Sequence, residues 1–184
     1  MLGKTHVALG LAGTAMIISV NPKTAPVTLA TAAFASLIPD IDDDNSFLNH
    51  KIDFGFRPLG AVVFTILLFS LSYLKIISVI SFIVLETALL LSVFSRHRSF
   101  SHSLIGLLTY SIGVYLAYKA VFVPFVIGYS FHIIADMFTN NGVELLYPYR
   151  KRIGIGLIST GSIWDTLIMI FGFLVFMASN SMHL

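Results

Sequence analysis

Seven apolar segments, separated by short polar connections, dominate the pattern of the chain. They cover residues 5–20, 25–39, 59–74, 76–95, 103–118, 120–138 and 162–179. A helix needs about 20 apolar residues to cross the hydrocarbon of a bilayer, and the fourth and sixth segments reach that length. The pattern predicts an all-α fold, a polytopic membrane helix bundle in which residues 1–184 form a single integral membrane domain.

The first two segments are the weakest of the seven because they are short and rich in Gly, Ala and Thr. Small residues allow helices to pack closely inside a bundle. Two arrangements therefore remain open for residues 5–39: two short helices inside the protein, or a re-entrant hairpin that does not cross fully.

The composition supports a membrane protein and narrows its chemistry. Hydrophobic residues make up 57% of the chain and charged residues 11%, whereas soluble domains have about 45–50% and about 25%. The chain has no cysteine, so any metal must bind nitrogen and oxygen ligands. A net charge of +2 is too small to indicate a nucleic-acid partner.

The basic residues orient the predicted segments. With the N-terminus inside, eight Lys and Arg residues lie on the cytoplasmic side and only three, Lys23, Lys75 and Lys119, on the other. This bias follows the positive-inside rule. It predicts that the loops 40–58, 96–102 and 139–160 all face the cytoplasm, where long polar connections leave room for function.

Almost all of the metal-type side chains fall on this same side. The exceptions are Glu86, in the middle of a segment, and His183, at the chain end. A polytopic protein with these ligands at one interface is expected to hold a membrane-embedded metal site. The gathered residues are His6, His50, His97, His102, His132, Asp40, Asp42, Asp43, Asp44, Asp53, Asp136, Glu144 and Asp165.

Two polar motifs end apolar segments. In Pro39-Asp40-Ile41-Asp42 the carboxylates need a neutralising cation or base, and the alternatives are metal ligation or a solvated acidic loop. His97 and His102 flank a turn between two helices, where neutral imidazoles suit zinc-like metals. The alternative for this pair is that the histidines only anchor the helix ends.

A third motif lies within an apolar segment. His132 and Asp136 are four residues apart and so share one helix face. They could both bind a metal, Asp136 could orient His132, or the two could form a self-contained hydrogen bond that stabilises the bundle. His6 has the same predicted depth and side. Asp165 opens the last segment, either as a helix-end charge or as a further ligand or base.

Together these motifs resemble the YdjM-like family of bacterial inner-membrane metal-dependent hydrolases. The matching pieces extend from the first segment to about residue 150, and their order and spacing are jointly specific. They are His6, Pro39-Asp40-Ile41-Asp42, His97-Arg98, His102-Ser103, His132 with Asp136, Gly142, and Leu146-Tyr147-Pro148. The resemblance implies a multi-pass protein of the inner membrane, remotely similar to zinc-dependent phospholipase C.

The hypothesis that follows is hydrolysis of a phosphoester in a lipid or lipid-linked substrate at the inner face. A metal-activated water would be the nucleophile, with zinc the first choice and manganese or iron as alternatives. The expected metal ligands are His6, Asp40, His97, His102, His132 and Asp136. The expected catalytic carboxylates are Asp42, Asp136 and Asp165, and the expected phosphate-binding residues are Arg57, Arg98 and Arg150.

Two other functions remain open at this stage. A non-catalytic regulator or scaffold would close its metal site with protein ligands alone. A small transporter would use Glu86 as a proton or ion site near the membrane midplane.

Overall fold

The computed structural model describes residues 1–42 and 59–181, and within them the chain is all-helical as predicted. The described residues contain seven α-helices and two short 3-10 helices, η1 (Ile38–Asp42) and η2 (Lys119–Val121). Their backbone pairs as β-structure only at two isolated bridges. The α-helices are α1 (Gly3–Ile17), α2 (Ala25–Ala35), α4 (Leu59–Tyr73), α5 (Val79–Phe94), α6 (Leu104–Ala117), α7 (Phe122–Met137) and α8 (Ile163–Ser181).

Each helix lies on one predicted segment, and the first two are shorter than the segments that predicted them. α1 ends at Ile17 and α2 at Ala35, so they have 15 and 11 residues. Pro39 accounts for the early end of α2, because it has no N–H to bond the Ala35 carbonyl four residues earlier and its ring would clash with that carbonyl in a continued helix. The last residues of the predicted segment form η1 instead.

The chain divides into two compact units, which are described separately. Unit 1 comprises Met1–Ile38, Val123–Val143 and Arg152–Leu184, and unit 2 comprises Pro39–Phe122 and Glu144–Lys151. The units are defined by contacts within the chain and not by independent folding. The single integral membrane domain therefore stays a prediction.

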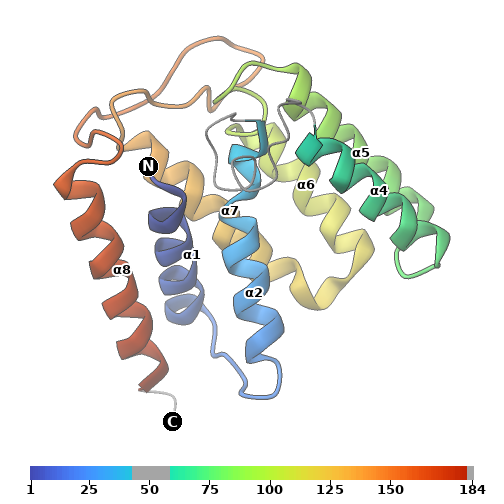
Figure 1. Cartoon of the computed structure of the whole chain (residues 1–184), viewed down its shortest axis with the longest axis horizontal. Coiled ribbons are helices and arrows are strands. Elements are labelled where there is room, and N and C mark those ends of the chain that lie inside the picture. The colour runs from blue at the N-terminus through green and yellow to red at the C-terminus, as the bar shows by residue number, and fades with distance from the viewer. Residues whose placement is uncertain (43–58, 182–184) are drawn as a thin grey trace. The chain divides into compact units, whose positions relative to one another are not determined.

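In unit 1, α1 packs against both α2 and α8 (Figure 1). Small residues bring these helices together: a β-carbon on Gly172 of α8 would lie 3.2 Å from Ala8 of α1. The starts of α1 and α8 lie at one end of the unit, together with the ends of α2 and α7 (Figure 1). This end, which we call the polar end of unit 1, carries His6, His132, Asp136 and Asp165.

In unit 2, α5 packs against α4 and α6. Ser78 and Ser103 cap the N-termini of α5 and α6 by accepting hydrogen bonds from the backbone N–H groups of Ser81 and Gly106. The hydroxyl of Ser81 donates to the Gly113 carbonyl at 2.9 Å, which joins the start of α5 to the end of α6.

Exposed apolar side chains cover much of the described helices, as a membrane protein requires. Among the described residues one helical stretch, Lys119–Met137, is long and apolar enough to cross a membrane by length and composition, and half of it is buried within the protein. Five further apolar helices have between 10 and 17 residues.

Candidate metal-binding clusters

The polar end of unit 1 holds three predicted metal ligands in full burial: His6, His132 and Asp136. His132 and Asp136 project from one face of α7, as their four-residue spacing predicts. Nε2 of His132 lies 3.9 Å from Oδ2 of Asp136, and Nε2 of His6 lies 3.3 Å from Oδ1 of the same carboxylate. We call these three residues the α7 cluster.

The protonation of His132 follows from its other ring nitrogen. Nδ1 lies 2.7 Å from the backbone carbonyl oxygen of Ser36, at the end of α2. A carbonyl oxygen can only accept, so Nδ1 carries the proton, and in the neutral ring Nε2 then carries a lone pair. Metal-ligating histidines typically donate their second N–H to a carbonyl or carboxylate in this way.

His6 adds a second imidazole to the α7 cluster. Its ring stacks on that of His132 with centroids 3.7 Å apart and 16° between the planes. Neither ring nitrogen of His6 makes a hydrogen bond to a described residue, which is costly for buried polar atoms. The amino group of Met1 also bonds Oδ1 of Asp136. Two imidazoles around one buried carboxylate are a donor set that fits a divalent ion such as zinc.

Asp165 lies at the same end of unit 1 and is also fully buried. Its carboxylate accepts hydrogen bonds from the Thr5 hydroxyl at 2.7 Å and from the backbone N–H groups of Leu2 and Gly161 at 3.0 and 2.8 Å. These bonds tie the start of α1 to the start of α8, as a helix-end charge would. The catalytic role expected for Asp165 stays a prediction.

Unit 2 holds a second group of predicted ligands, the α6 cluster: Asp40, His97 and His102. Nε2 of His102, a fully buried residue, lies 3.4 Å from Oδ1 of Asp40, whose side chain is 15% exposed. The ring of His97 meets that of His102 edge to face at 5.4 Å. The hydroxyl of Ser101 lies 3.0 Å from Nδ1 of His102 and can accept a hydrogen bond from the Nδ1–H group. In that neutral tautomer Nε2 of His102 carries a lone pair.

The turn between α5 and α6 places both histidines of this cluster. Arg98 adopts a left-handed conformation with φ of +65°, and its carbonyl accepts a hydrogen bond from the Glu144 N–H at 2.9 Å. The Ser103 hydroxyl donates to the Phe100 carbonyl while capping α6. The five-residue spacing of His97 and His102 thus requires the sharp turn that the sequence predicted.

Four of the predicted ligands have side chains that could hold a metal ion: Asp40 and His102 of unit 2, and His132 and Asp136 of unit 1. The predicted catalytic residue Asp42 ends η1, but its side chain lies outside the described part of the chain, as does the whole of Arg57.

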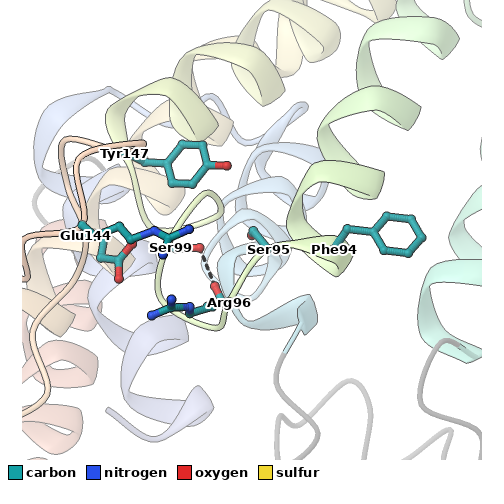
Figure 2. A pocket seen from close by; sticks show the side chains of 7 residues that line it. Phe94, Ser95, Arg96, Ser99, Glu144 and Tyr147 are labelled. Carbon is teal, nitrogen blue, oxygen red and sulfur yellow. Dashed lines mark hydrogen bonds between the residues drawn. The ribbon is translucent and has the colours of Figure 1, made fainter.

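A pocket of 260 Å³ in unit 2 contains functional groups that the sequence did not single out as a set (Figure 2). Of the arginines expected to bind phosphate, Arg150 lines this pocket, whereas Arg98 lies in the neighbouring turn and is only 7% exposed. Arg96 and Ser99 could have been identified as candidate pocket residues from the sequence, because they lie next to the predicted ligand His97. The lining residues are Phe94, Ser95, Arg96, Ser99, Glu144, Tyr147 and Arg150.

Glu86 lies apart from both clusters, on α5. One oxygen of its carboxyl group accepts a hydrogen bond from the Thr65 hydroxyl of α4 at 2.8 Å, and the other is buried without a hydrogen bond to a described residue. Glu86 therefore joins two helices within unit 2.

Comparison with known proteins shows the family to which the chain belongs. The chain matches the family model described as YdjM inner membrane protein over residues 1–184. It is 29% identical to the uncharacterized protein YvsG of Bacillus subtilis (strain 168) over 172 residues, 92% of this chain and 88% of that relative. It is 28% identical to the inner membrane protein YdjM of Escherichia coli (strain K12) over 129 residues, 66% of this chain and 50% of that relative. No solved structure matches the chain.

Proposed function

Since the chain belongs to the YdjM inner membrane protein family, we propose that it is a membrane-embedded hydrolase that uses divalent metal ions to cleave a phosphoester. The substrate would be a lipid or lipid-linked molecule at the inner face of the membrane. The names of the relatives support a bacterial inner-membrane location.

One observation carries the proposal: Nδ1 of His132 lies 2.7 Å from the Ser36 carbonyl oxygen, which assigns the ring proton to Nδ1. The bond to the Ser36 carbonyl keeps that proton in place, so a lone pair on Nε2 lies near the Asp136 carboxylate, 3.9 Å away. A metal ion beside these two acceptor groups would add to the positive charge that the Met1 amino group already places at Oδ1 of Asp136. A structural hydrogen bond between the two side chains would need the opposite tautomer.

A bound divalent ion would supply Lewis-acid catalysis and lower the pKa of a water to about 7. Around it, the residues of the chain have separate tasks. His6 and His132 provide nitrogen ligands in unit 1, and Asp136 provides negative charge and a proton acceptor for the attacking water. In unit 2, Asp40, His97 and His102 provide oxygen and nitrogen ligands. Zinc fits these donors best, with manganese or iron as alternatives.

Metal content tests the proposal directly. We expect protein purified in detergent to contain stoichiometric divalent metal by elemental mass spectrometry, and His132→Ala and Asp136→Ala to reduce it to background. His183→Ala is the matched control, because it removes a histidine at the chain end and should leave the metal content unchanged.

Activity is then measured with phosphoester lipids added to the loaded protein. Hydrolysis by the wild type that is lost in His132→Ala would support the proposed hydrolase activity. A folded wild type that takes up no zinc, manganese or iron would remove the chemical basis of the proposal. Metal without hydrolysis of any phosphoester would favour the non-catalytic regulator instead.

A further inference from the structure

The pocket in unit 2 combines the guanidinium groups of Arg96 and Arg150 with the carboxylate of Glu144, and Arg96 directly precedes His97 of the α6 cluster in the sequence. Figure 2 shows Arg96, Ser99, Glu144 and Tyr147 gathered together, with the ring of Phe94 pointing away from them. Its volume of 260 Å³ is just below the roughly 300–1,000 Å³ of pockets for drug-sized ligands. The space therefore suits a small polar group better than a whole lipid.

The positive side of this pocket has the chemistry of a phosphate site. Arg96 and Arg150 each present a planar fork of donors that matches phosphate oxygens, and the Tyr147 hydroxyl adds a further donor. The two serines contribute less, because Ser95 and Ser99 already donate to the carbonyls of Ser92 and Arg96 at 3.1 and 2.6 Å.

Glu144 makes the pocket more than an anion site. The residue is only 5% exposed, and its backbone N–H is fixed by the Arg98 carbonyl. Among the described residues no ion pair or hydrogen bond joins its carboxylate to Arg96 or Arg150, although all three line the same pocket. The carboxylate lines the same pocket as the two guanidinium groups, so a ligand that carries both a cation and an anion matches this lining better than an anion alone.

We propose that this pocket binds the phosphoethanolamine headgroup of a lipid. The phosphate would accept hydrogen bonds from Arg96, Arg150 and Tyr147, and the primary ammonium would donate to Glu144. The acyl chains would leave beside Phe94, which is 85% exposed and continues the apolar surface of α5. Inorganic phosphate or a glycerol headgroup offers Glu144 no ammonium group, and a choline headgroup brings a cation without N–H donors.

As a statement about substrate class, this inference rests on the proposed function, but binding itself requires neither metal nor hydrolysis. The test therefore uses the full chain in detergent, stripped of metal with a chelator. Native mass spectrometry would count bound lipids with phosphatidylethanolamine, phosphatidylglycerol and phosphatidylcholine of identical acyl chains. Soluble phosphoethanolamine and inorganic phosphate would be added as competitors.

We expect phosphatidylethanolamine to bind about tenfold more tightly than the other two lipids, as one extra charge-assisted hydrogen bond would give. Glu144→Gln keeps the shape of the side chain and should abolish the preference for phosphatidylethanolamine over phosphatidylglycerol. Arg96→Ala and Arg150→Ala should each weaken the binding of all three lipids. Lys151→Ala is the control, because it removes a neighbouring exposed cation that does not line the pocket.

Equal affinity for the three lipids, or a Glu144→Gln variant that keeps the preference, would overturn the proposal. So would inorganic phosphate competing as well as phosphoethanolamine, since the ammonium would then contribute nothing. An effect of Lys151→Ala equal to that of Arg96→Ala would reduce the pocket to general attraction between positive charge and lipid. Lipid preference without any hydrolysis would leave this inference standing and remove the proposed function, and hydrolysis without the preference would do the reverse.

Discussion

At the scale of single residues, hydrogen-bond donors decide which carboxylates and imidazoles are available for chemistry. Asp136 and Asp165 are both fully buried at one end of unit 1, but their surroundings differ. Asp165 accepts three hydrogen bonds that hold helix ends together, whereas Asp136 accepts a hydrogen bond from the Met1 amino group and is flanked by two imidazoles. The first arrangement favours structure and the second favours ligation.

This contrast predicts a different loss for each carboxylate. Asp165→Ala leaves Leu2, Thr5 and Gly161 without their acceptor, so we expect the free energy of unfolding to fall by on the order of 3 kcal/mol. Thermal unfolding in detergent, followed by tryptophan fluorescence, measures this. Ser162→Ala, which removes only a 3.3 Å cap from the Asp165 N–H, should cost about 1 kcal/mol. If Asp165→Ala instead keeps the stability of the wild type but loses hydrolysis, Asp165 has the catalytic role.

At the scale of elements, the close approach of α2 and α7 sets the geometry of the α7 cluster. Gly128 lies one turn before His132 on the same face of α7, and Ala32 lies one turn before Ser36 on α2. A β-carbon on Gly128 would collide with the carbonyl oxygen of Ala32. The absence of a side chain at Gly128 therefore allows the His132–Ser36 hydrogen bond one turn further along.

We expect Gly128→Ala to separate these helices, to lower the free energy of unfolding by about 1–3 kcal/mol and to weaken metal binding about tenfold or more, as loss of an orienting partner does. Metal titration and thermal unfolding measure the two effects. The matched control is Gly172→Ala, since its β-carbon would approach Ala8 to 3.2 Å, which requires only a small adjustment. Metal binding that survives in Gly128→Ala would show that the Ser36 bond is not needed.

At the scale of the whole molecule, the distribution of charge makes a prediction about topology. Seven basic residues lie in the motif-bearing loops, Lys4 lies at the N-terminus on the same predicted side, and three lie on the opposite connections. This bias predicts that the loops face the cytoplasm. The family and the names of its relatives support the inner membrane as the location. The orientation within that membrane is a separate, testable expectation.

The absence of cysteine permits single-cysteine labelling without further engineering. Asn45→Cys should react with a membrane-impermeant maleimide only after the cytoplasmic side is opened, because position 45 belongs to a motif-bearing loop. Lys119→Cys, on an opposite connection, should react in intact spheroplasts. The reverse pattern would mean that the metal ligands face outward and that the positive-inside rule fails for this chain.

The sequence alone determined the helices of the described residues to within a few positions, and it also determined the chemical nature of the ligands. Apolar runs show where helices lie, since each helix buries its own backbone polar groups. The four-residue spacing of His132 and Asp136 was also sufficient to place them on one face, because helix periodicity is local. Nitrogen and oxygen ligands followed from the absence of cysteine.

Only the tertiary structure decided how those groups are paired. The acceptor for His132 is the carbonyl of Ser36, 96 residues away, and a backbone carbonyl has no signature in a sequence. The stacking of His6 on His132, the three donors around Asp165 and the meeting of Glu144 with Arg96 at one pocket are likewise long-range contacts. They depend on helix packing and turn geometry, which place residues distant in the chain side by side.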